Sequence, residues 1–174
     1  MEDAPVLVLI TLLGPVSGAH FNPAVTMVFA LRGELSARDA IGYIAAQIAA
    51  AVLGVWLAHL MFDLDILQTS VRERSGTGQW AAEITATFGL VFVILAGLRT
   101  APALIPVLVG LYIMAALWFT ASTSFANPAV TIARMLTDTF SGIQPADVMP
   151  FIASQITGAL LGWAVCNALY PTGD

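Results

Sequence analysis

The sequence predicts an all-α membrane protein in which two related halves are inserted in opposite directions. The first observation is composition: 59% of the 174 residues are hydrophobic and only 10% are charged. The mean hydropathy is +0.88, whereas a soluble domain is about 45–50% apolar. The second observation is a set of four long segments that are almost free of charge. The third is the tripeptide Asn-Pro-Ala, which occurs twice.

Charge and cysteine content exclude several other classes of protein. The net charge is -5 and all six basic residues are arginines, so we expect no nucleic-acid partner and no polybasic patch on the protein. The single cysteine, Cys166, lies in an apolar run, which excludes a disulfide framework within the chain. The sequence offers no cluster of metal-ligating residues, and we expect neither a metal nor a cofactor.

The N-terminal segment is apolar but short. Residues Ala4–Leu13 carry no charge before the pair Gly14-Pro15. Ten residues of helix extend only about 15 Å, against about 30 Å for the hydrocarbon core of a bilayer. We therefore expect a helix that ends at Leu13 and cannot cross the membrane alone.

Each Asn-Pro-Ala copy is predicted to open a short helix. Asparagine is a favoured N-cap because its side-chain oxygen accepts an unpaired backbone N–H, and proline suits the first helical position because no N–H is needed there. The first helix should end at Arg32-Gly33 and the second near Arg134. Each would then contain about nine residues and extend roughly 13 Å, about half of the hydrocarbon core. The two copies are Asn22-Pro23-Ala24 and Asn127-Pro128-Ala129.

Four segments are long enough to cross a bilayer. Three carry no formal charge between their ends, and the fourth carries only Glu83, which could be an interfacial acid or a functional one. A charged loop, a turn that contains proline and the second tripeptide separate them. The four predicted spans are residues 39–63, 80–98, 101–126 and 148–170.

The number of spans between the two tripeptides sets their relative orientation. Three spans lie between them, so the chain crosses the membrane an odd number of times and the second copy enters from the opposite face. A second match supports an inverted repeat, because residues 43–54 resemble residues 151–162. We predict a single domain over 1–174, with a first, incomplete repeat over 1–78 and a second over 79–174. Inverted repeats with broken helices are a recurrent design for moving solutes.

The loops before the two tripeptides are predicted to line a polar path. Backbone carbonyls freed from helical pairing would face this path, together with the amide NH₂ of each asparagine. Both short helices would direct their positive dipole ends, roughly half a charge each, at the same point, so cations and protons are repelled while small neutral solutes pass. The carbonyls belong to Gly18, Ala19, His20, Thr123, Ser124 and Phe125.

These features resemble the aquaporin and aquaglyceroporin, or major intrinsic protein, family. The resemblance rests on both tripeptides, on residues 17–20, on Glu83 within residues 83–88, and on the repeated spans that contain Gln47 and Gln155. It implies a right-handed bundle of six spans and two re-entrant half-helices, embedded in the lipid of a bacterial inner membrane as a homotetramer with one pore per subunit. It also implies that Glu83 accepts backbone N–H groups of a re-entrant loop, and that the protein is not an enzyme.

The chain departs from the family pattern in two places. The family has a complete transmembrane helix before the one that ends at Leu13, so we expect this chain to be N-terminally truncated, with the first helix missing. The narrowest constriction of the family usually has an arginine three residues after the second motif asparagine, where this chain has Val130. By the same spacing, the constriction also includes Ala115 and Ser124.

Valine in place of arginine predicts a wider and less polar constriction, because an isopropyl group replaces five hydrogen-bond donors and a fixed charge. Arg134 follows one turn later on the same helical face and would supply a displaced charge at the outer mouth. Residues 127–140 resemble bacterial aquaglyceroporins associated with arsenic resistance. The resemblance implies a passive channel for glycerol-type polyols and undissociated metalloid acids such as arsenite, with water as a further candidate.

Other interpretations stay open. A secondary transporter would also use inverted repeats, but it needs ionisable residues near the midplane, and Glu83 is the only candidate. The chain could instead be a non-functional fragment of a channel, or its two motifs could be ordinary capped helices in loops. A membrane enzyme is disfavoured, because the sequence offers no metal-ligand cluster, no nucleophile with a base and no carboxylate pair.

Overall fold

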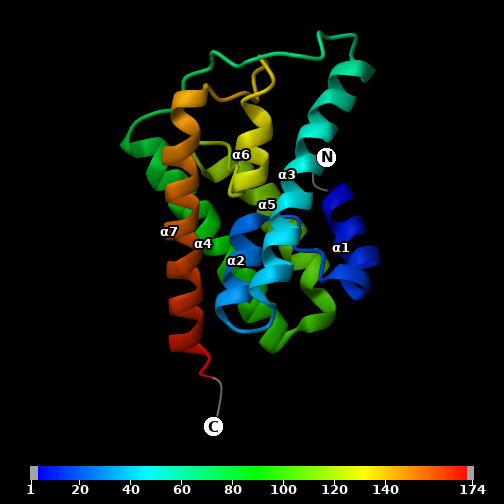
Figure 1. The fold of residues 1–174 in the computed structure, drawn as a ribbon. Helices are drawn as coiled ribbons and strands as arrows, with labels where there is room; N and C mark the ends of the chain where they lie inside the picture. Colours follow the sequence, from blue (N-terminus) through cyan, green and yellow to red (C-terminus); the bar gives the residue numbers. More distant parts are fainter. Residues whose placement is uncertain (1–3, 172–174) are drawn as a thin grey trace.

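The computed structural model describes residues 4–171, and in this part of the chain every regular element is a helix. Four helical stretches, residues 37–61, 77–100, 102–119 and 145–169, are apolar and long enough to cross a membrane by length and composition. The predicted all-α membrane fold is confirmed. The elements in chain order are α1 (Ala4–Ser17), α2 (Pro23–Leu31), α3 (Ala37–Met61), α4 (Thr77–Thr100), the 3₁₀ turn η1 (Pro102–Leu104), α5 (Ile105–Phe119), α6 (Pro128–Arg134) and α7 (Pro145–Leu169) (Figure 1).

The two short helices begin at the prolines of the tripeptides, as predicted. α2 has nine residues, whereas α6 has seven instead of the expected nine or so. The physical reason lies in its last turn: the N–H groups of Met135 and Leu136 donate to the carbonyls of Ile132 and Ala133, three residues back. This tighter pairing ends the α-helix at Arg134.

One predicted helix end is wrong. α1 continues past Leu13 to Ser17, because Pro15 removes only one backbone donor and the Gly18 N–H still donates to the Gly14 carbonyl at 2.9 Å. Within the charge-free segment 101–126, α5 ends at Phe119, because Thr120 adopts an extended backbone. The residues between Thr120 and α6 therefore form a loop.

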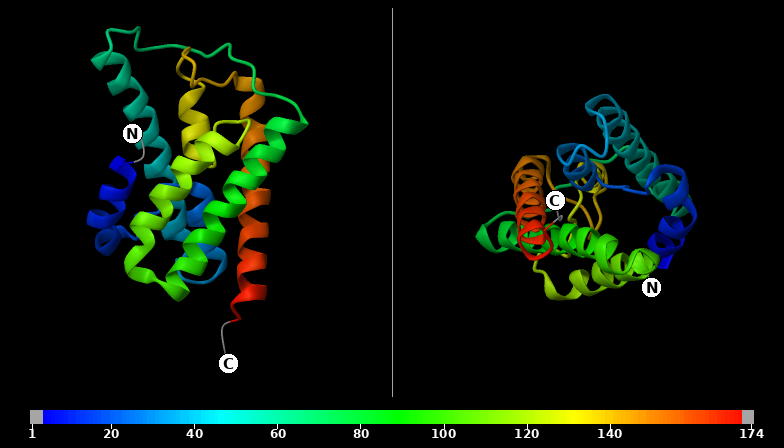
Figure 2. Two further views of the ribbon diagram at one scale, coloured as in Figure 1. Left: turned by 180° about the vertical axis from the view of Figure 1, so that it is seen from behind. Right: turned by 90° about the horizontal axis from the view of Figure 1, so that it is seen from below.

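The long helices surround the two short ones. α4 and α7 lie side by side along most of their length, α5 packs on α4, and α1 packs on α5 (Figures 1 and 2). α2 and α6 each pack against both α3 and α7, and α6 lies above α2 in Figure 1. The two short helices are thus held between the same pair of long helices.

The interface of α4 and α7 depends on glycine. A Cβ atom added at Gly158 or Gly162 on α7 would overlap backbone carbonyl oxygens of Ile84 or Phe88 on α4. The two backbones therefore approach closely, as small residues allow in membrane helices. Gly54 on α3 is the counterpart of Gly162 in the predicted repeat, and its added Cβ would meet nothing within 4 Å.

This difference predicts opposite effects of the same substitution. Gly162→Ala should lower the free energy of unfolding by about 1–3 kcal/mol, because the clash is with backbone atoms. Gly54→Ala should raise it by up to about 1 kcal/mol, because alanine favours a helix more than glycine does. Thermal unfolding in detergent, followed by circular dichroism, measures both changes. Equal shifts of Tm would contradict the close approach of α4 and α7.

Candidate functional site

The amino ends of α2 and α6 are each capped by the motif asparagine. Asn22 Oδ1 accepts a hydrogen bond from the Ala24 N–H at 2.9 Å. Asn127 Oδ1 accepts from the Ala129 N–H at 2.9 Å and from the Val130 N–H at 3.3 Å. Both asparagines have an extended backbone, and a proline follows each at the first helical position. The geometry at each end is the one that the tripeptide predicts.

The two capped ends are also joined to each other. Asn22 Nδ2 donates to the carbonyl of Ala126 at 2.7 Å, and Asn127 Nδ2 donates to the carbonyl of Phe21 at 2.9 Å. Each bond connects one asparagine to the residue just before the other, so the helices meet amino end to amino end. An amide NH₂ has two hydrogens. One hydrogen of each asparagine is used here, and only the other is left for a solute.

The loops before both motifs hold residues in the left-handed region of the backbone. This conformation costs about 1–2 kcal/mol for a residue with a side chain, so surrounding contacts must maintain it. It also turns successive carbonyls away from helical pairing. The residues with side chains and positive φ in these loops are Ala19 (47°), Phe21 (49°), Thr123 (60°), Ser124 (49°) and Ala126 (46°).

A buried carboxylate holds the second loop in place. Glu83 lies on α4 and its exposed fraction is 0%. Its Oε1 accepts from the Phe125 N–H at 2.9 Å, and its Oε2 accepts from the Ala126 N–H at 2.8 Å. Oε2 also accepts from Gln155 Nε2 at 2.6 Å. Glu83 thus lies in the interior and binds the loop, which is not the position of an interfacial acid.

The same polar pattern recurs beside both short helices. Gln47 Nε2 donates to Thr26 Oγ1 at 2.9 Å beside α2, and Gln155 Nε2 donates to Thr131 Oγ1 at 2.8 Å beside α6. The ring nitrogen Nδ1 of His20 also lies 3.2 Å from Thr26 Oγ1, so His20 is part of the loop packing.

Within residues 4–171, no group of three or more potential metal ligands comes together.

A cavity of about 830 Å³ lies beside the joined amino ends. Residues of the two loops and motifs line it, together with mostly apolar side chains of α1, α2, α4 and α5. The loop and motif residues that line it are Gly18, Ala19, His20, Phe21, Asn22, Ser124, Phe125, Asn127, Val130 and Arg134.

Some predicted site residues do not line this cavity. Ala115 is exposed on α5, and Ile113 and Leu117 line the cavity in its place. Residues four apart share one face of a helix, whereas a residue midway between them points to the opposite face. Thr123 is exposed as well. Four further motif residues are buried behind the asparagines and shape the helix starts: Pro23, Ala24, Pro128 and Ala129.

The end of the cavity beside α6, which we call the α6 end, combines apolar and charged groups. Val130 and Arg134, one turn apart on α6, both line it. The guanidinium carbon of Arg134 lies 4.3 Å from the centre of the Phe125 ring, a cation–π contact. The side chain closest to the motif on this face of α6 is therefore an isopropyl group, and the positive charge follows one turn later.

No sequence pattern singles out Arg74, which the structure places behind the α6 end. It lies between α3 and α4 in a segment of charged residues and glycines, which is typical of a solvated loop, yet its exposed fraction is only 7%. Its side chain binds backbone carbonyls 48, 66 and 68 residues away. Because these partners are distant in the sequence, no local signal could have found this residue.

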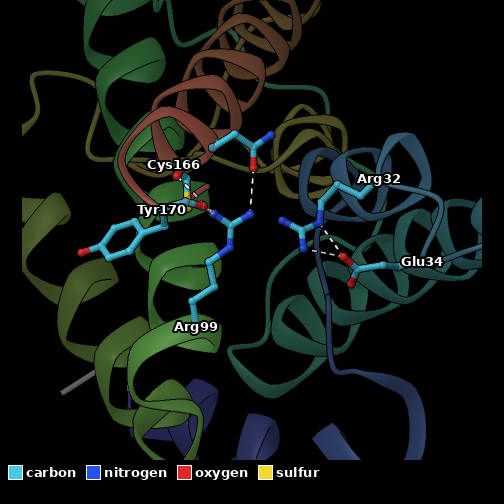
Figure 3. Close-up of polar contacts among 6 residues, drawn as sticks. Arg32, Glu34, Arg99, Cys166 and Tyr170 are labelled. Atoms are coloured by element: carbon cyan, nitrogen blue, oxygen red, sulfur yellow. Dashed lines mark hydrogen bonds and ion pairs between the residues drawn. The ribbon is translucent and has the colours of Figure 1, made fainter. Parts of the chain in front are cut away.

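A separate polar cluster ties α7 to α4 at the opposite end of the molecule (Figure 3). Arg99, in the last turn of α4, donates to the carbonyls of Cys166 and Tyr170. It also donates to Asn167 Oδ1 at 2.8 Å. The Cys166 carbonyl also accepts from the Tyr170 N–H at 2.9 Å, and Tyr170 is the residue just after α7. Arg32 and Glu34 form an ion pair next to this cluster. These contacts stabilise the ends of the helices.

Comparison with known proteins gives the following matches. The family described as Major intrinsic protein matches residues 3–124. The chain is 56% identical to Aquaglyceroporin AqpS of Rhizobium meliloti (strain 1021), covering 95% of this chain and 71% of that protein. It is 33% identical to Aquaporin NIP3-1 of Arabidopsis thaliana, covering 90% and 52%, and 32% identical to Aquaporin NIP1-1 of Zea mays, covering 91% and 58%. The chain thus spans between half and three quarters of the length of these relatives.

Proposed function

We propose, from the premise that this chain belongs to the major intrinsic protein family, that its cavity is the solute pathway of a channel. The aquaglyceroporins of this family are passive channels for small solutes and not enzymes. The chain is accordingly an integral protein of a bacterial plasma membrane. The finer proposal is that it conducts small uncharged polyols such as glycerol and undissociated metalloid acids such as arsenite, with water as a further permeant.

The reciprocal bonds between the two asparagine motifs carry this proposal. They bring the positive ends of two helix dipoles together beside a cavity that both asparagines line. Each asparagine keeps one amide hydrogen for a solute, and loop carbonyls in left-handed turns would supply acceptors. A solute with hydroxyl groups can exchange its water for these partners. A cation cannot make this exchange, because the two positive helix ends repel it.

We propose that Val130 gives the α6 end its solute preference. Its isopropyl group offers no donor and no charge, so bulky hydroxylated solutes pass more easily than they would beside an arginine. Ser124, which also lines the cavity, leaves a single small hydroxyl on the neighbouring loop. Arg134 would act as a charge at the outer mouth. Glu83 is already engaged by three donors, which is unfavourable for a proton-coupled transporter.

Liposome assays test this function. The reconstituted protein should accelerate glycerol entry at least tenfold over empty liposomes, measured by stopped-flow light scattering. Val130→Arg should reduce glycerol permeability about fivefold or more, because it adds a long charged side chain to the cavity wall. The matched control is Val71→Arg, since Val71 is exposed in the loop before α4. Equal glycerol permeabilities for Val130→Arg and the unaltered protein would show that Val130 does not determine solute preference. The absence of any glycerol flux would contradict the channel proposal.

We also propose a homotetramer. Family resemblance supports it, and large apolar side chains are exposed along α3, including Leu53, Leu57 and Leu60, where lipid or another subunit would cover them. Mass measurement by light scattering on the detergent-solubilised protein tests the assembly. A single species of monomer mass would contradict it.

A further inference from the structure

Arg74 is built into the wall behind the α6 end. Its Nε donates to the carbonyl of Gly142 at 2.7 Å, its Nη1 to that of Ser122 at 3.1 Å, and its Nη2 to that of Phe140 at 3.0 Å. All three nitrogens of one planar guanidinium are thus used on carbonyls from two separate loops. The fixed fork of arginine suits such an arrangement, whereas the single ammonium of lysine does not.

The first route from Arg74 to the cavity runs along the backbone. The Ser122 carbonyl that Arg74 binds belongs to a fully buried residue. Ser122 Oγ accepts a hydrogen bond from the Ser124 N–H at 3.2 Å, and Ser124 lines the cavity in a left-handed conformation. Displacement of Ser122 would therefore move a lining residue whose backbone is already strained.

The second route runs through an aromatic ring. The guanidinium carbon of Arg74 lies 4.7 Å from the centre of the Phe125 ring, and that of Arg134 lies 4.3 Å from the same centre. Phe125 and Arg134 both line the cavity, whereas Arg74 does not. The ring thus lies against one arginine at the cavity and one behind it. Each contact favours a fixed ring position.

We propose that Arg74 is a positioning residue that determines solute discrimination at the α6 end, by fixing the loop 122–126 and the Phe125 ring against which Arg134 lies. This proposal rests on the proposed channel function. Arg74 touches no solute and acts only through these neighbours. From behind the cavity wall, Arg74 holds the loop and the ring in place. This matters at the α6 end, because the Val130 side chain forms no hydrogen bond there.

The charge of Arg74 is maintained despite its burial. Desolvation, assisted by the charges of Arg72 and Arg134, lowers the pKa of Arg74 to about 10. The guanidinium therefore stays protonated at neutral pH, and its hydrogen bonds persist across the ordinary range of assay conditions. Permeability measurements near neutral pH consequently report on geometry and not on the titration of this group.

The first experiment compares solutes of different size in liposomes. We expect Arg74→Gln and Arg74→Lys each to lower the ratio of glycerol to ribitol permeability at least threefold, because a loosened wall discriminates less. The matched control, Arg72→Gln, changes an exposed arginine two residues away and should leave the ratio unchanged. If Arg74 only stabilised the fold, its variants would yield less folded protein, but the glycerol to ribitol ratio per folded channel would stay the same. That result would overturn the proposal. Full recovery with lysine would overturn the requirement for the fork.

The second experiment does not depend on conduction. Ser124→Cys places a thiol on the lining loop, while the native Cys166 is buried. The rate at which a small water-soluble thiosulfonate labels this thiol should change at least threefold when Arg74→Gln is added and should be unaffected by Arg72→Gln. Unchanged labelling would overturn the proposal. If the unaltered protein conducts no solute, the channel function fails, and the labelling rates still decide whether Arg74 positions the loop.

A third variant covers the case in which Arg74 variants do not fold. Phe125→Leu removes the ring between the two arginines but leaves the three carbonyl bonds of Arg74 intact. We expect the glycerol to ribitol ratio to fall at least threefold in this variant as well. An unchanged ratio would show that the Phe125 ring does not link Arg74 to solute discrimination in the cavity. This part of the proposal would then be wrong.

Discussion

Glu83→Gln is expected to destabilise the fold by about 2–4 kcal/mol and to abolish solute passage. Three donors, the N–H groups of Phe125 and Ala126 and the side chain of Gln155, converge on the two carboxylate oxygens. A glutamine has one acceptor oxygen and would direct its NH₂ at another donor. At least one buried donor then loses its partner, which costs about 1–3 kcal/mol, and bonds to a charged acceptor are worth more than neutral ones.

The loss should not stay local. Ser124 and Ala126, on the loop that Glu83 holds, have positive φ, and Ala126 supplies the carbonyl that Asn22 binds. Without the carboxylate, the loop would relax and the bond between the two motifs would weaken. We therefore expect both a lower Tm and a lower glycerol permeability per folded channel.

Thermal unfolding in detergent and liposome swelling together measure these effects. Glu73→Gln is the control, because Glu73 is an exposed glutamate in the loop that leads to α4 and accepts a hydrogen bond from the nearby Ser75 hydroxyl. A Glu83→Gln protein that melted with the parent and conducted at the parent rate would show that the loop keeps its shape without the charge.

The motif helices could be predicted from sequence because their signals are local. Asparagine and proline fix the start of a helix through bonds that reach only two or three residues ahead, and α2 begins and ends where these signals place it. The long spans followed from hydropathy, since lipid requires about 20 apolar residues per crossing. Local chemistry and the solvent thus determine most of the helical framework.

Features that depend on distant contacts escaped prediction. The position of the Arg74 side chain depends on carbonyls from the loops on either side of α6. Whether Ala115 faces the cavity depends on the rotation of α5 about its axis. The sequence spacing that indicated Ala115 measures distance along the chain, but it does not establish which face of α5 is turned to the cavity. Ser124 and Val130 do line the cavity, since both lie within three residues of the fixed cap Asn127, and their role at a constriction stays a prediction.

The second large effect is expected where the two motifs meet in the proposed pathway, at which Asn127→Asp should admit cations. The carboxylate keeps an oxygen to cap α6, but the atom that faces the Phe21 carbonyl changes from a donor to an acceptor. The 2.9 Å bond at this point becomes a repulsion between two oxygens. A full negative charge also offsets the two helix ends, each of which carries roughly half a positive charge, so little net positive charge is left to repel cations.

Sodium leak into liposomes, followed with an entrapped indicator, measures this effect against Asn127→Ser. Serine also caps a helix well and also lacks the amide donor, but it adds no charge, so the difference between the two variants isolates electrostatics from geometry. We expect a sodium flux at least tenfold above background for Asn127→Asp and none for Asn127→Ser, with glycerol permeability reduced in both. If both variants leaked equally, cation exclusion would depend on the bond between the motifs and not on the opposed dipoles. If both remained tight to sodium, the barrier would lie elsewhere along the cavity.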